Sequence, residues 1–222
     1  MFDYSLDMPI LQANNISKTF DHKLFENINL NLNAGQTIAI VGESGCGKST
    51  LLNILSTLLP PDNGYVLYDN QNLYKNKQNN ITHIRRDSFG IIFQAHYLFR
   101  GFNCQENLTI GSLLSGHSID HTLLKALKID NILHQNIGQL SGGQQQRLSV
   151  ARVLTKKPKI IFADEPTGNL DKQTAYDVSQ LLFDYVKTQD ASMVLVTHDR
   201  NLAFKCDIVY ELDDGLLNIL EI

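Results

Sequence analysis

Apolar and polar positions follow three different patterns along this chain. Residues 28–32 alternate apolar and polar with a period of two, which predicts a half-buried strand. The runs 38–41, 160–163 and 193–196 are almost wholly apolar, as is typical of parallel strands buried on both faces. Leucines at 51, 52, 55, 58 and 59 recur at helical spacing until Pro60, where a helix must stop. Strands that alternate with helical segments in this way predict an α/β fold with a parallel sheet.

The remaining segments carry weaker patterns. A turn is expected at 61–64, followed by a short strand at 65–68. Residues 69–80 are polar and rich in Asn and Lys, and we interpret them as a solvated connector. Residues from about 95 to 155 have mostly helical spacing, with an apolar stripe that includes Leu124, Leu148 and Leu154. This segment is expected to be a helical insertion in the sheet domain.

Composition narrows the possible partners. The chain has 222 residues, with 19 Lys and Arg against 23 Asp and Glu, and a formal net charge of −4. Such a chain has no bulk attraction for nucleic acid, so no nucleic-acid partner is expected. No stretch approaches the roughly 18 consecutive apolar residues of a membrane span, and residues 1–10 do not resemble a leader peptide. Three widely spaced cysteines fit a reducing cytoplasm. Membrane contact is therefore expected only through partners.

A glycine-rich loop lies between the strand predicted at 38–41 and the following helix. Its sequence fits G-x-x-x-x-G-K-[ST], the P-loop pattern, in the structural context that this pattern requires. Its glycines let backbone N–H groups converge on phosphate oxygens, Lys48 neutralises the β- and γ-phosphates, and the Ser49 hydroxyl can ligate Mg²⁺. The predicted ATP-binding residues of this loop are Gly42, Glu43, Ser44, Gly45, Cys46, Gly47, Lys48, Ser49 and Thr50.

Two carboxylates follow the buried run at 160–163. Asp164 suits the Mg²⁺ shell, as in P-loop NTPases generally. Glu165, one residue further on, is expected to point in a different direction and to polarise an attacking water as a general base. Both residues come at the carboxyl end of a predicted parallel strand, the edge at which ligands bind in open α/β sheets.

Residues 140–147 read LSGGQQQR and narrow the class of P-loop protein further. Ser141 and Gln144 have the spacing of a capping box at the start of a helix, and Gly142 and Gly143 allow close backbone approach to an anion. The segment resembles the LSGGQ signature of ATP-binding cassette (ABC) ATPases. The resemblance implies that these four residues bind ATP.

The other motifs of that family follow in order. Gln94 resembles the Q-loop glutamine, which in the family contacts Mg²⁺ and the attacking water. Asn169 and Asp171 match the D-loop and are expected to contribute to ATP binding. His198 matches the switch histidine, expected to hold the γ-phosphate and orient the water. Phe20 stands where most family members have a tyrosine that stacks on adenine, and a place in the core is the alternative for it.

The resemblance covers essentially the whole chain and implies its architecture. We expect a single domain over residues 1–222 with a RecA-like P-loop NTPase core, an N-terminal antiparallel β subdomain and an inserted α-helical signature subdomain. The core with its β subdomain is placed at about 1–94 and 156–222, and the helical subdomain at about 95–155.

The family also implies how such a chain works. The signature segment of one subunit closes over the P-loop nucleotide of another, so a homodimer with two ATP molecules is expected, in an isologous arrangement. Glu165, His198, Gln94 and Lys48 are the expected catalytic residues, and Ser49, Gln94 and Asp164 the expected Mg²⁺ ligands. Two integral membrane permease subunits are the implied partners, which places the chain at the cytoplasmic face of a bacterial inner membrane.

Residues 165–171 read EPTGNLD and are similar to the group of ABC ATPases that includes LolD, MacB and FtsE. Residues 94–102 are similar to the lipoprotein-releasing members, which favours an ATPase subunit of LolCDE or MacB type. Two departures concern the segment that meets the membrane partner: residues 107–140 are short, and Gln139 replaces a common proline. The alternatives are an FtsE-like ATPase that regulates cell-wall hydrolysis at division and, more remotely, a soluble ABC ATPase that acts on nucleic acid.

Overall fold

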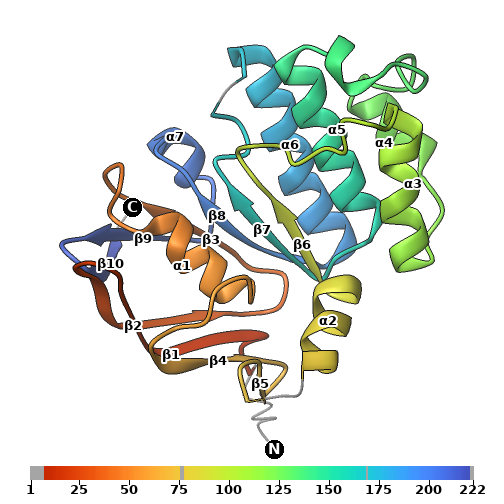
Figure 1. Ribbon diagram of the computed structural model, residues 1–222. Coiled ribbons are helices and arrows are strands. Elements are labelled where there is room, and N and C mark those ends of the chain that lie inside the picture. Colours follow the sequence, from red (N-terminus) through yellow and green to blue (C-terminus); the bar gives the residue numbers. More distant parts are fainter. Residues whose placement is uncertain (1–7, 76–77, 169, 221–222) are drawn as a thin grey trace, which may run out of the picture.

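Two sheets form the framework of the chain. The computed structural model describes residues 8–75, 78–168 and 170–220. The smaller sheet is antiparallel with the order β2-β1-β4-β5 (Figure 1). Its strands are β1 (Leu11–Thr19), β2 (Lys23–Leu32), β4 (Asn63–Tyr68) and β5 (Gln71–Asn72). The strands expected at 28–32 and 65–68 lie within β2 and β4.

The larger sheet has the order β10-β9-β3-β8-β7-β6. All its pairs are parallel except that of β10 with β9. Its strands are β3 (Thr37–Val41), β6 (Phe89–Ile92), β7 (Ile160–Asp164), β8 (Ser192–Val196), β9 (Ile208–Asp213) and β10 (Leu216–Leu220). The three apolar runs lie in β3, β8 and β7, which are neighbours at the centre of this sheet. Their continuous apolar sequence is therefore explained by burial on both faces.

Helices cover both faces of the larger sheet. They are α1 (Lys48–Leu55), α2 (Gln78–Asp87), α3 (Cys104–Ser115), α4 (His121–Ala126), α5 (Gly142–Thr155), α6 (Lys172–Gln189) and α7 (Arg200–Ala203), with a 3₁₀ turn at Ile137–Gln139. In Figure 1, α1 lies between the two sheets, whereas α3, α4, α5 and α6 gather on the other side of the larger sheet.

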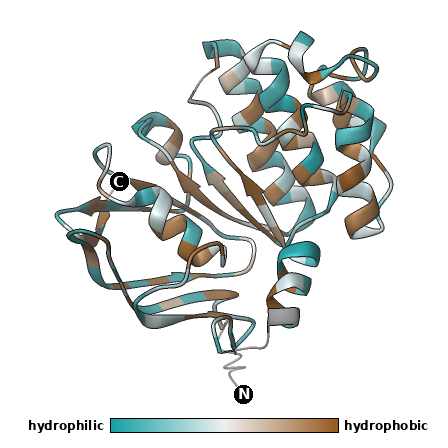
Figure 2. Ribbon diagram, viewed as in Figure 1, coloured by the Kyte–Doolittle hydropathy of each residue, from teal (hydrophilic) through white to brown (hydrophobic). Residues whose placement is uncertain are grey.

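The alternation of side chains along each central strand builds two cores. Ile38 and Ile40 pack with the leucines of α1 and with the antiparallel sheet. Ala39 and Val41 face the opposite way and join the core formed by α3, α5 and α6. Figure 2 shows the central strands as nearly continuous hydrophobic ribbons. The sheet is thus held from both sides, which fixes the carboxyl ends of β3, β7 and β8 relative to one another.

The structure corrects three expectations about local elements. The helix expected to run to Pro60 ends at Leu55, and the next turn leaves Leu58 exposed. The segment 69–80 contains strand β5 and the start of α2, so it is more than a connector. Residues 95–155 hold three α-helices separated by turns, because Ile129, Ile132 and other apolar residues are buried from irregular backbone.

The architecture confirms the expected α/β class with an antiparallel β subdomain, a parallel P-loop core and a helical insertion. The subdomain boundaries near residues 95 and 155 stay predictions. Within residues 8–75, 78–168 and 170–220, no helix is both long and apolar enough to cross a membrane.

Candidate active site

The glycine-rich loop joins the end of β3 to the start of α1, as predicted. Gly42 has φ 150°, and a side chain there would collide with the carbonyl oxygen of Leu212 in β9. Gly47, the N-cap of α1, has φ 106°, a left-handed value that glycine adopts without strain. None of the described side chains caps α1 through a hydrogen bond. The first backbone N–H groups of this helix are therefore available to an anion.

Lys48 is folded back over the loop. Its Nζ donates to the carbonyl oxygens of Gly42 at 2.9 Å and Glu43 at 2.6 Å, and only 8% of the residue is exposed. The Sγ of Cys46 lies 3.8 Å from the same nitrogen. Lys48 thus supplies a cation held at the floor of the loop.

The loop and strand β7 meet at one contact. The Ser49 hydroxyl donates to Oδ1 of Asp164 at 3.0 Å. Burial raises the pKa of the Asp164 carboxyl above its usual range, and the charge of Glu165 adds to this, whereas the Ser49 hydroxyl and Lys48 oppose it. A cation bound here would reverse that balance. A hydroxyl and a carboxylate at this spacing are oxygen ligands of the kind Mg²⁺ prefers, so these residues fit the ion.

Glu165 is held by the segment that follows β8. Its backbone has φ 45°, and its N–H donates to the carbonyl oxygen of Val196 at 2.9 Å. Oε1 lies 2.8 Å from both the backbone nitrogen and Nδ1 of His198, while Oε2 accepts from the Thr197 hydroxyl at 3.3 Å. The structure thus brings Glu165 and His198 into contact, although they lie 33 residues apart.

These groups line a single cavity of about 500 Å³. Phe20, Gln94, Asp164, Glu165 and His198 share it with the loop. Phe20 is 56% exposed, which rules out a place in the core, and Nζ of Lys18 lies 5.5 Å from its ring centroid. An aromatic face at one end and a phosphate-type loop at the other fit a nucleotide.

Four contributors were missed from sequence, and one of them is Val196 at the end of β8, which lines the cavity. His22 and Leu24 line the cavity, because the turn after Phe20 folds over the loop. Thr197 contacts Glu165. The only sign of these residues in the sequence is their position, because each lies one to four positions from Phe20 or His198, which were predicted site residues.

The signature residues lie elsewhere. Ser141 caps α5 by accepting from Gln144 N–H at 3.3 Å, and Gln144 Oε1 accepts from Ser141 N–H at 2.9 Å. This confirms the expected capping box. Asp171 caps α6 by accepting from the N–H groups of Gln173 and Thr174. Of the described residues that line the nucleotide-like cavity, none comes from 141–144 or is Asp171. Asn169 lies outside the described residues.

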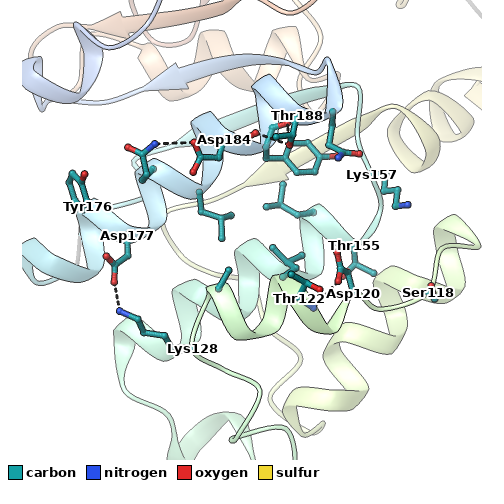
Figure 3. Close-up of a pocket in the computed structure, with 17 residues that line it drawn as sticks. Ser118, Asp120, Thr122, Lys128, Thr155, Lys157, Tyr176, Asp177, Asp184 and Thr188 are labelled. Carbon is teal, nitrogen blue, oxygen red and sulfur yellow. Dashed lines mark hydrogen bonds and ion pairs between the residues drawn. The ribbon is translucent and has the colours of Figure 1, made fainter.

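A second cavity, of about 620 Å³, lies between α4 and α6 (Figure 3). The Lys128–Asp177 ion pair, 2.6 Å between Nζ and Oδ2, joins its two walls. The described residues that line it include none of the predicted site residues. The chemistry predicted from sequence therefore belongs to the smaller cavity.

Comparison with known families and proteins agrees with the family resemblance found in the sequence. Residues 25–168 match the family model described as "ABC transporter". The lipoprotein-releasing system ATP-binding protein LolD of Rickettsia bellii (strain RML369-C) is 41% identical over 221 residues, covering 95% of this chain and 98% of that protein. LolD of Protochlamydia amoebophila (strain UWE25) is 38% identical, covering 94% and 96%.

Solved structures agree on the fold. The dimeric post-hydrolysis state of the ATP-binding cassette MJ0796, bound to ADP and Pi, superposes with a TM-score of 0.86 at 32% identity, covering 96% of this chain and 99% of that one. The protein cbiO1 of Clostridium perfringens, part of the transporter complex cbiONQ, gives a TM-score of 0.81 at 27% identity, covering 95% and 87%.

Proposed function

This chain belongs to the ABC transporter family and is an ATPase of that family, and we propose that it is the ATP-hydrolysing subunit of a lipoprotein-releasing complex. The observation that carries the finer assignment is its 38–41% identity to LolD proteins along nearly the whole chain. In this proposal the chain works at the cytoplasmic face of a bacterial inner membrane. It binds two integral membrane permease subunits and contacts the membrane only through them.

The loop and its neighbours bind the nucleotide in this proposal. Phe20 stacks on adenine, and the loop N–H groups with Lys48 hold the phosphates, which the uncapped start of α1 supports. Ser49, Asp164 and Gln94 would hold Mg²⁺, which would supply positive charge beside the phosphate oxygens. The 3.0 Å contact between Ser49 and Asp164 supports a shared ligand position.

Glu165 and His198 act on the attacking water. The Glu165 carboxylate accepts its proton, and His198 orients the water and contacts the γ-phosphate. In the present arrangement Nδ1 of His198 faces Glu165, so Nε2 is the ring nitrogen free to contact a phosphate. Oε1 has two donor contacts, both from His198, whereas Oε2 has only that of Thr197 among the described residues, so a lone pair of Oε2 remains to accept the water proton.

The remaining motif residues act across a homodimer. Ser141, Gly142, Gly143 and Gln144 close over the nucleotide of the partner subunit, with Asn169 and Asp171 beside them. Their distance from the chain's own cavity supports this division, because no described residue of 141–144 lines it.

Turnover of a Glu165→Gln variant tests the assignment of the base. The amide keeps the size of the carboxylate but cannot accept the water proton, so hydrolysis should fall by roughly 10² to 10⁴ while ATP binding stays. Phosphate release and binding of a fluorescent ATP analogue are measured in parallel. Glu26→Gln, a matched change at an exposed carboxylate, should hydrolyse ATP normally. Hydrolysis by Glu165→Gln near the wild-type rate would remove Glu165 from this role.

Affinity capture tests the proposed partners. Glu165→Gln protein is recovered from native membranes with ATP and Mg²⁺, and the co-purifying proteins are identified by mass spectrometry. A permease with a large periplasmic domain, accompanied by lipoprotein, is the expected result. Capture of a division protein with regulators of cell-wall hydrolases would replace lipoprotein release with a division-gating role. The matched control is Lys48→Ala, which should not trap the ATP-bound complex.

A further inference from the structure

Thr197 occupies the one position between strand β8 and the histidine of the cavity. It is fully buried, with 0% exposed, and its backbone N–H donates to the carbonyl oxygen of Ile40 in β3 at 3.2 Å. Strand β3 leads directly into the glycine-rich loop. The residue is therefore fixed to the same strand that positions the phosphate-binding loop.

The Thr197 hydroxyl both accepts and donates a hydrogen bond. Oγ1 accepts from the backbone N–H of Asp199 at 3.1 Å and donates to Oε2 of Glu165 at 3.3 Å. A threonine hydroxyl has one proton, and an N–H partner occupies a lone pair, so that proton is directed to the carboxylate. The contact therefore has a defined donor and a defined acceptor.

The other side-chain partner of Glu165 is exposed. The His198 side chain is 72% exposed, whereas that of Glu165 is only 13% exposed. The carboxylate has two donors besides this imidazole, the His198 backbone N–H on Oε1 and the Thr197 hydroxyl on Oε2. Two donors on different oxygens fix the plane of a carboxylate, whereas one leaves it free to rotate.

We propose that Thr197 is a positioning residue for hydrolysis: its hydroxyl holds the Glu165 carboxylate in the orientation that receives the proton of the attacking water. This inference rests on the proposed role of Glu165. A misplacement of about 1 Å in a catalytic group can lower a rate by roughly a hundredfold. The hydroxyl therefore contributes to kcat and makes no contribution to ATP binding.

Two substitutions separate the hydroxyl from the volume of the side chain. Thr197→Val keeps the shape and removes the donor, and we expect kcat to fall about tenfold to a hundredfold with KM for ATP changed less than about twofold. Thr197→Ser restores the hydroxyl and should recover most of kcat. Thr155→Val is the matched control, since Thr155 is also buried and donates only to Ala151 within α5. Wild-type kcat in Thr197→Val, or equal loss in the Ser and Val variants, would overturn the proposal.

A double-mutant cycle distinguishes positioning from a general structural role. If Thr197 acts through Glu165, then adding Thr197→Val to Glu165→Gln should cause no further loss of hydrolysis. Additive losses would contradict the proposal. Wild-type hydrolysis by Glu165→Gln alone would instead refute the proposed function of Glu165. Thermal unfolding of each variant with and without ATP verifies that the losses occur in folded, nucleotide-binding protein.

Discussion

Glu165 adopts a left-handed backbone conformation that a glutamate seldom takes. A φ of 45° costs about 1 kcal/mol or more for a residue with a Cβ, and contacts on all sides offset this cost. The Glu165 N–H bonds to Val196, and its carboxylate has three donor contacts to Thr197 and His198. A strained residue that is so fully fixed by its neighbours is a recognised feature of active sites.

Cys46 is the thiol that modification should reach first. It is half-buried in the loop, whereas Cys104 and Cys206 are buried, and burial raises the pKa of Cys104 and raises that of Cys206 to about 12. N-ethylmaleimide at Cys46 should block hydrolysis because its bulk would displace Lys48, whose Nζ lies 3.8 Å from the Cys46 sulfur, and ATP should protect the thiol. Phosphate release and peptide mass mapping measure both effects.

The control for this prediction is Cys46→Ser, which keeps a small polar side chain in the loop and should resist the reagent. Full hydrolysis by protein that mass mapping shows to be modified at Cys46 would contradict the prediction.

Residues of the loop could be predicted from sequence because their geometry is local. Gly42 to Thr50 are contiguous, and their chemistry depends only on a strand before them and a helix after them. Thr197 and His22 could not be predicted in this way, because their contacts with the site arise from the arrangement of distant strands.

Helix α5 connects the signature segment to the turn after β7 through one buried amide. Nε2 of Gln146 donates to the carbonyl oxygen of Pro166 at 2.7 Å, and Oε1 of the same side chain is buried without a partner among the described residues. The bond crosses from the helical insertion to the residue directly after Glu165.

Gln146→Leu should affect hydrolysis more than folding. It removes one hydrogen bond but also removes an unpartnered buried oxygen, so the free energy of unfolding should change by less than about 1.5 kcal/mol. The looser turn should lower kcat by roughly threefold to tenfold. Denaturant unfolding and phosphate release measure the two quantities. The exposed Gln180→Leu on α6 is the control, and a wild-type kcat in Gln146→Leu would rule out coupling through this bond.

The end of α5 carries a lysine whose protonation should affect stability. Nζ of Lys156 donates to the carbonyl oxygens of Arg85 and Phe89, at 2.8 Å each. Burial lowers its pKa from 10.5 to about 8, with Asp87 opposing and Arg152 adding to this shift. The folded state therefore binds fewer protons than the unfolded state between these two pH values.

Stability contributed by this site should rise with pH. The penalty for the buried cation is fully present below about pH 8 and declines towards pH 10.5. The unfolding free energy of wild type minus that of Lys156→Met should increase by about 1–2 kcal/mol between pH 7.5 and 9.5. Urea titrations across this range measure it, and parallel curves for the two proteins would contradict the predicted shift.

At the scale of elements, burial explains which strands and helices could be predicted from sequence. The runs in β3, β7 and β8 were recognised because both faces of each strand are covered. The extent of helices in 95–155 was overestimated because Ile129 and Ile132 are apolar residues buried from turns, and spacing alone does not separate these from a helix.

For the whole molecule, the proposed function divides each nucleotide site between two chains, with the loop from one chain and the signature segment from the other. A mixture of Lys48→Ala and Ser141→Glu chains should hydrolyse ATP although each variant alone is inactive. In the mixed dimer, the loop of the Ser141→Glu chain meets the signature segment of the Lys48→Ala chain, which restores one complete site. Phosphate release measured against mixing ratio should peak near equal amounts. Activity equal to the sum of the separate variants would contradict a composite site.

Gly42 also has a consequence for how the chain is made. Its loop rests against the carbonyl oxygen of Leu212, and β3 lies between β8 and β9, whose residues are translated about 155 to 170 positions later. A ribosome must therefore synthesise nearly the whole chain before the loop acquires its neighbours. Nascent or prematurely terminated chains would carry the P-loop sequence without a formed pocket, so they would not sequester cellular ATP.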